Sequence, residues 1–154
     1  IVMVLAVGAM LNIVDEMGGI DLLSAVMSAI MTKSTATPIM GMSAGLLSFV
    51  SSALGVVYPT MMPMCADIAA EVGGVNPVAL MAAVGAGGSL AGISPLSTGG
   101  ALAMAALGTA IPNLSKEEEN RRFVQLFVMA AIALLTLTIC CAVFYNPVAA
   151  LLHG

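Results

Sequence analysis

Two short polar tracts interrupt an otherwise apolar sequence and hold the side chains best suited to bind an ion. The first is Ser51 and Ser52, followed by Ala53; the second contains Ser94, Pro95, Ser97, Thr98 and Gly99. Carbonyl oxygens at the C-terminus of a broken helix suit a hard cation such as Na⁺, and amides and hydroxyls at an N-terminus suit a carboxylate. These eight residues are therefore our candidate binding residues, with Na⁺ placed near Ser51, Ser97 and Thr98.

The surrounding composition indicates that a lipid bilayer is the solvent of this chain. Of its 154 residues, 60% are hydrophobic and 8% are charged, whereas a soluble domain carries about 25% charged residues. In hydrocarbon, an unsatisfied backbone group costs several kcal/mol, so each polar break needs partners. An ion or a substrate can supply them. Alternatively, the breaks are packing kinks whose serines bond back to their own helices, but two breaks in adjacent segments favour a function.

Several functional classes are disfavoured. The net charge is −4 with four Lys plus Arg, which argues against nucleic acid as a partner. His153 is the single histidine and lies next to the last residue, so we expect no Ser/His catalytic pair, no histidine metal site and no enzyme. The three cysteines lack metal-ligand spacing, and we expect no cofactor.

The lengths of the apolar segments predict an all-α membrane protein, a helical bundle with a re-entrant hairpin and a discontinuous transmembrane helix. A spanning helix needs about 20 residues, and several segments are shorter. The predicted segments are the end of a spanning helix (1–17), an interfacial arm (20–33), a hairpin (39–66), a broken helix (77–111) and a last span (123–145). The hairpin is expected to turn at the serine tract, with a second arm over 53–65.

Three local patterns refine these segments. Ser115 and Glu118 form a capping box that is expected to open the last helix, after a polar loop over 112–122. Asn146 and Pro147 are expected to end that helix. The small-residue pairs Gly41 with Gly45 and Gly88 with Gly92 permit close helix approach.

The basic residues predict the topology. Three of the four lie in 112–122, which the positive-inside rule puts in the cytoplasm, so the C-terminus is expected outside. We expect an integral protein of a bacterial inner membrane. Because the chain begins at Ile1 within an apolar run, we also expect a missing N-terminal half.

The order of elements and the two breaks resemble the C-terminal repeat of the divalent anion:sodium symporter family within the ion transporter superfamily, with the malonate and C4-dicarboxylate carrier-like branch looking closest. The family has a Ser-Asn-Thr motif at each hairpin tip, and the matching tripeptide here is Ser51, Ser52, Ala53. A Gly-Thr-Pro-Pro-like break of the family resembles the segment from Gly92 to Thr98.

This resemblance implies one of two inverted repeats of an elevator-type transporter. It also implies a homodimer, Na⁺ as the coupling ion and a small di- or monocarboxylate as the substrate. A non-transporting membrane subunit for assembly or anchoring, in which both breaks are packing kinks, is the alternative.

Overall fold

The computed structural model describes residues 2–111 and 115–152, and the secondary structure of these residues is entirely helical. The predicted all-α class is therefore confirmed. The elements are α1 (Val2–Glu16), α2 (Gly19–Ile30), α3 (Ala36–Val50), the π-helix η1 (Ala53–Val57), α4 (Tyr58–Val72), α5 (Pro77–Ala91), α6 (Thr98–Ala110) and α7 (Lys116–Leu152).

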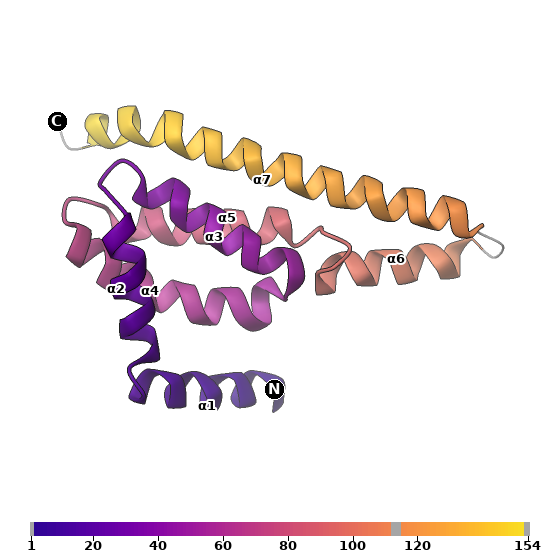
Figure 1. Cartoon of the computed structure of the whole chain (residues 1–154), viewed down its shortest axis with the longest axis horizontal. Helices are drawn as coiled ribbons and strands as arrows, with labels where there is room; N and C mark the ends of the chain where they lie inside the picture. Colours follow the sequence, from indigo (N-terminus) through magenta and orange to yellow (C-terminus); the bar gives the residue numbers. More distant parts are fainter. Residues whose placement is uncertain (1, 112–114, 153–154) are drawn as a thin grey trace.

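Helices α3 and α5 lie side by side at the centre of the molecule, with α4 below them and the long α7 across the top (Figure 1). Glycines make the α3–α5 contact close. A Cβ at Gly41 would lie 3.3 Å from the Ala83 carbonyl oxygen, and a Cβ at Gly87 would collide with the Gly41 backbone. The Ser48 hydroxyl also donates to the Gly88 carbonyl over 2.7 Å. The predicted close approach of small residues is confirmed, and it fixes the two helices against each other.

A methionine-rich core lies between α2, α3, α4 and α5. The buried side chains include Met31, Met40, Met61, Met64 and Cys65. Flexible thioethers fill the irregular gaps between these helices, beside branched side chains such as Ile68 and Leu80. This core anchors the start of α4, and with it the segment that follows the first polar tract.

The first polar tract leaves Ser51 and Ser52 between α3 and η1, and the helical structure that follows is longer than predicted. We expected a hairpin over 39–66 whose second arm covers 53–65, and this predicted arm ends too early. Together η1 and α4 form 20 helical residues, Ala53–Val72, which are long and apolar enough to cross a membrane. The helix continues because Asp67 and Glu71 are exposed on its surface, and because Pro63 removes one backbone hydrogen bond without ending it.

The sequence 77–111 is divided into α5 and α6 by the non-helical segment 92–97. Asn76 caps α5, since its side-chain oxygen accepts a hydrogen bond from the Val78 amide over 2.9 Å. Helix α6 extends away from the central helices beside the first part of α7 (Figure 1). Gly100 is the buried residue of α6, so this helix is held mainly at its N-terminus.

Helix α7 corrects two predicted boundaries. It begins at Lys116, so most of the expected loop over 112–122 is helical, and it continues past Asn146 and Pro147 to Leu152. The early start follows from the capping box, which is confirmed: Ser115 Oγ accepts from the Glu118 amide over 3.2 Å, and the Glu118 carboxylate accepts from the Ser115 amide over 3.4 Å. The basic residues used for the topology prediction therefore lie on the first two turns of a helix.

Much of α7 exposes apolar side chains, and the segment Lys116–Val143 is long and apolar enough to cross a membrane. Ala130 and Leu134 are buried, whereas Met129, Ile132 and Ile139 are each more than half exposed. Such a surface suits hydrocarbon better than water. The chain thus has two candidate membrane-spanning helices among its described residues, Ala53–Val72 and Lys116–Val143.

Replacing the capping serine should unwind the start of α7. In Ser115→Ala, the Glu118 amide loses its acceptor, and we expect a loss of about 1 kcal/mol of local helix stability. Hydrogen exchange of the first-turn amides measures this loss. Ser115→Thr, which keeps a capping hydroxyl, is the control. Unchanged exchange in Ser115→Ala would show that the box does not hold this helix end.

Candidate functional site

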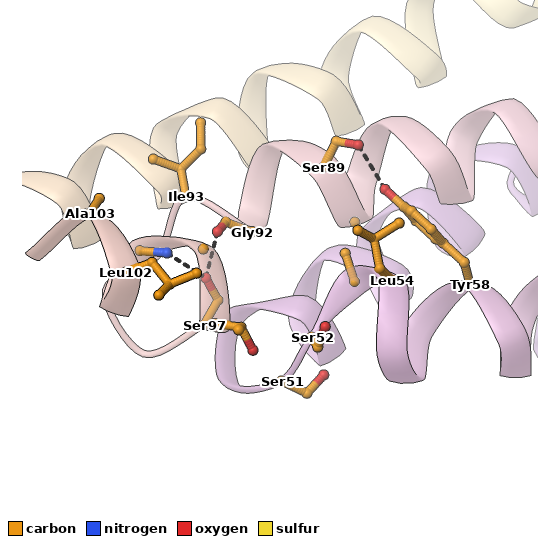
Figure 2. A pocket seen from close by; sticks show the side chains of 15 residues that line it. Ser51, Ser52, Leu54, Tyr58, Ser89, Gly92, Ile93, Ser97, Leu102 and Ala103 are labelled. Carbon is orange, nitrogen blue, oxygen red and sulfur yellow. Dashed lines mark hydrogen bonds between the residues drawn. The ribbon is translucent and has the colours of Figure 1, made fainter. Parts of the chain in front are cut away.

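The two polar tracts meet at one pocket of about 630 Å³. Residues of both line it (Figure 2), and six are candidate binding residues: Ser51, Ser52, Ala53, Ser97, Thr98 and Gly99. Ser94 and Pro95 are buried and do not line the pocket. The structure thus brings residues about 45 positions apart in sequence to one cavity.

At the first break, the two serines have opposite hydrogen-bonding roles. The Ser51 hydroxyl donates to the Leu47 carbonyl over 2.6 Å, which ends α3. The Ser52 hydroxyl oxygen instead accepts from the Gly55 amide over 3.1 Å and caps η1. Ser52 therefore keeps its own proton for a ligand, because no acceptor for it lies in the described part of the chain.

At the second break, Ser97 holds the loop together. Its hydroxyl contacts the carbonyl oxygens of Gly92, at 2.5 Å, and of Ser94, at 2.7 Å, and it accepts from the Gly100 amide over 3.3 Å. Ser94 Oγ accepts from the Leu96 amide. Ser94 is thus a structural residue of the loop, and Ser97 is chiefly the N-cap of α6.

The glycines at the start of α6 allow this tight loop. A Cβ at Gly99 would lie 2.8 Å from the Gly92 carbonyl oxygen, and one at Gly100 would overlap the Ser94 carbonyl. Any larger residue would push α6 away from the end of α5. The pocket therefore keeps its shape only if residues 99 and 100 are glycines.

Two helix N-termini face the same pocket. Ser52 to Gly55 begins one, and Ser97 to Gly100 begins the other, each with a serine that accepts from the amide three residues later. The positive ends of two helix dipoles therefore lie at one cavity. None of its described lining residues is charged, so a bound anion would meet dipoles and hydroxyls rather than a lysine or an arginine.

The hydroxyl of Thr98 is the most available polar group of the pocket. Thr98 is exposed, lines the pocket and has no side-chain hydrogen bond to another described residue. For metals, no group of three His, Cys, Asp or Glu side chains occurs among the residues described. A cation here would therefore use hydroxyl and carbonyl oxygens, a set that suits Na⁺.

Sequence reasoning did not single out Tyr58 and Ser89, which also line the pocket. Tyr58 begins α4, and its hydroxyl lies 2.7 Å from Ser89 Oγ on α5 (Figure 2). One signal was present in the sequence: a tyrosine within an apolar helical run needs a polar partner for its hydroxyl. The identity of that partner required the fold.

Comparison with protein-family models, with curated proteins and with solved structures found no significant match. The fold and the pocket therefore define the class of this chain. It is an all-helical protein with two candidate membrane-spanning helices and a pocket at the junction of two helix breaks.

Proposed function

We propose that this chain contributes the binding pocket of a secondary active transporter for small mono- or dicarboxylates. The observation that carries the proposal is the meeting of two capped helix N-termini at one pocket without described charged residues. Half-helix N-termini facing a cavity are a means by which transporters hold carboxylates within the membrane. Ser52 and Thr98 supply hydroxyl donors to the same anion.

The coupling ion and the transport cycle are further parts of the proposal. Na⁺ would lie near Ser51, Ser97 and Thr98, where hydroxyls adjoin the carbonyl ends of α3 and α5. The resemblance to divalent anion:sodium symporters adds the expectation of a homodimer with a second, inverted repeat. In it, the hairpin and the broken helix would move together across a bacterial inner membrane. The close α3–α5 contact supports such joint movement.

A second candidate is a non-transporting subunit for assembly or anchoring. The observation that favours it is that the Ser51 proton is used by the Leu47 carbonyl of α3, and the Ser97 proton by carbonyls of the second break. Both breaks would then be packing kinks stabilised from within. The two candidates differ in what they require of Thr98, which makes no such internal bond.

Thr98→Ala separates the candidates. We measure uptake of radiolabelled malonate or succinate, driven by a sodium gradient, into vesicles containing the complete protein. The variant should lose about 10- to 150-fold in apparent affinity. The reason is that a hydrogen bond to a charged group contributes about 1.5–3 kcal/mol.

Thr109→Ala on the same helix is the matched control. The Thr109 hydroxyl donates to the Ala106 carbonyl over 2.8 Å and lies outside the pocket, so uptake should stay unchanged. Equal uptake by both variants and the wild type would remove Thr98 from the site. No uptake of either acid under any gradient would favour the non-transporting subunit.

A further inference from the structure

Tyr58 joins α4 to α5 at the wall of the pocket. Its ring occupies the space beside Gly88, where a Cβ would lie 2.7 Å from the ring atom Cε1. Its hydroxyl lies 2.9 Å from the Gly85 carbonyl oxygen. It also lies 2.7 Å from Ser89 Oγ (Figure 2). Both partners are on α5, one turn apart, so a single phenol group touches two successive turns of the same helix.

The chemistry of these three groups fixes the direction of both hydrogen bonds. A carbonyl oxygen can only accept, and a phenol has one proton. The Tyr58 proton must therefore go to the Gly85 carbonyl, since otherwise two oxygens would face each other over 2.9 Å without a proton. Ser89 must then donate its own proton to the Tyr58 oxygen.

Ser89 is left as a pure acceptor toward the pocket. A helical serine often donates to the carbonyl four residues earlier, which here is Gly85, but Tyr58 already uses that carbonyl. The Ser89 proton is committed to Tyr58, whereas its remaining lone pair is accessible because Ser89 is exposed and lines the cavity. The pocket thus combines donors at the helix N-termini with an acceptor on α5.

We propose that Ser89, held by Tyr58, selects carboxylates that also carry a hydroxyl donor. This inference rests on the proposed function, because it concerns the substrate of the same pocket. The carboxylate would meet the N-termini of η1 and α6 and the donors of Ser52 and Thr98. The substrate hydroxyl would donate to Ser89. Ser89 is then a specificity-determining residue and Tyr58 a positioning residue.

L-Malate and succinate test the idea directly, because they differ by one hydroxyl group. We expect the complete protein in lipid nanodiscs to bind malate about 3- to 10-fold more tightly than succinate in calorimetric titrations, the effect of one neutral hydrogen bond. Ser89→Ala should remove this preference, so that the ratio of malate to succinate affinity falls to about one. Ser28→Ala, which removes an exposed α2 hydroxyl bonded to the Ala25 carbonyl, should keep it.

Two further variants separate selection from a merely structural role. Tyr58→Phe frees the Gly85 carbonyl, so Ser89 can turn its proton there, and the malate preference should fall with the ring still packed on Gly88. Ser89→Thr keeps the hydroxyl and should keep the preference. An unchanged malate-to-succinate ratio in Ser89→Ala would overturn the inference.

The outcomes for the wild type also distinguish this inference from the proposed function. Equal affinity for malate and succinate would overturn the role of Ser89 alone, since the pocket would still bind carboxylates. Failure to bind either acid would overturn the proposed function and the inference with it. The preference must also appear with lactate over propionate, a second pair that differs by one hydroxyl.

Discussion

Gly87→Ala is expected to cause the largest loss of stability among the variants considered. The new Cβ would collide with the carbonyl oxygen of Gly41 and lie 2.9 Å from its carbonyl carbon. Both clashing atoms belong to the backbone of α3, so no side chain can rotate away. Separating α3 from α5 should cost about 3 kcal/mol, the upper end for overpacking, and should lower the midpoint of thermal unfolding in detergent by several degrees.

Gly85→Ala on the same helix is the matched control. A Cβ at Gly85 would meet the Met62 methyl at 3.8 Å, an ordinary contact. Because alanine also has the higher helix propensity, this variant should unfold at or slightly above the wild-type temperature. If Gly87→Ala and Gly85→Ala unfold at the same temperature, the close contact of α3 with α5 is not what stabilises the bundle.

Ser97→Ala is expected to have the second largest effect, on stability and binding together. The variant leaves the Gly100 amide and the carbonyls of Gly92 and Ser94 without their shared partner. Loss of a helix cap costs about 1 kcal/mol, and loss of a donor to buried carbonyls costs about 1–3 kcal/mol more. The N-terminus of α6 should fray, and binding of succinate should fall below detection in calorimetric titrations.

Ser97→Thr is the control, since a threonine hydroxyl can cap α6 in the same way. It should restore the thermal midpoint and much of the succinate affinity. Wild-type binding by Ser97→Ala would contradict the role of Ser97 in shaping the pocket. A lower midpoint with intact binding would leave it a role in folding alone.

Both variants are expected to change the relative position of the two helix N-termini at the pocket. Gly87 sets how closely α3 approaches α5, and Ser97 sets how α6 leaves the end of α5. Since η1 follows α3 and α6 follows α5, the relative position of the two helix N-termini depends on both contacts. A shift of either one would move a dipole end away from the pocket and weaken anion binding.

The sequence by itself determined the helical class and several of the helix ends. Low charge and long apolar runs indicate helices for a bilayer, because only internal hydrogen bonding satisfies the backbone in hydrocarbon. Local signals located several ends: Gly18, with φ of 72°, follows α1, Asn76 caps α5 and Ser115 opens α7. These signals act within about four residues, so they can be read without the fold.

Helix lengths were less well determined. The second hairpin arm was predicted to stop near residue 65, yet α4 reaches Val72, and α7 passes through Pro147. Polar residues and proline weaken a helix without ending it when their side chains reach solvent or when one lost hydrogen bond is tolerated. Which polar residues and prolines end a helix therefore depends on the tertiary environment of their side chains, which the sequence pattern does not contain.

The tertiary structure decided the role of Ser89, whereas Ser94 and Ser97 bond to residues close to them in sequence. All were equivalent hydroxyls in the sequence, but Ser94 is buried and used within its loop, Ser97 caps α6, and Ser89 is turned into an acceptor by Tyr58, 31 residues away. Hydrogen-bond direction depends on which groups meet in space and on how many protons each one has. That is why the pocket could be located from two polar tracts, whereas its distribution of donors and acceptors required the packing of α3, α4 and α5.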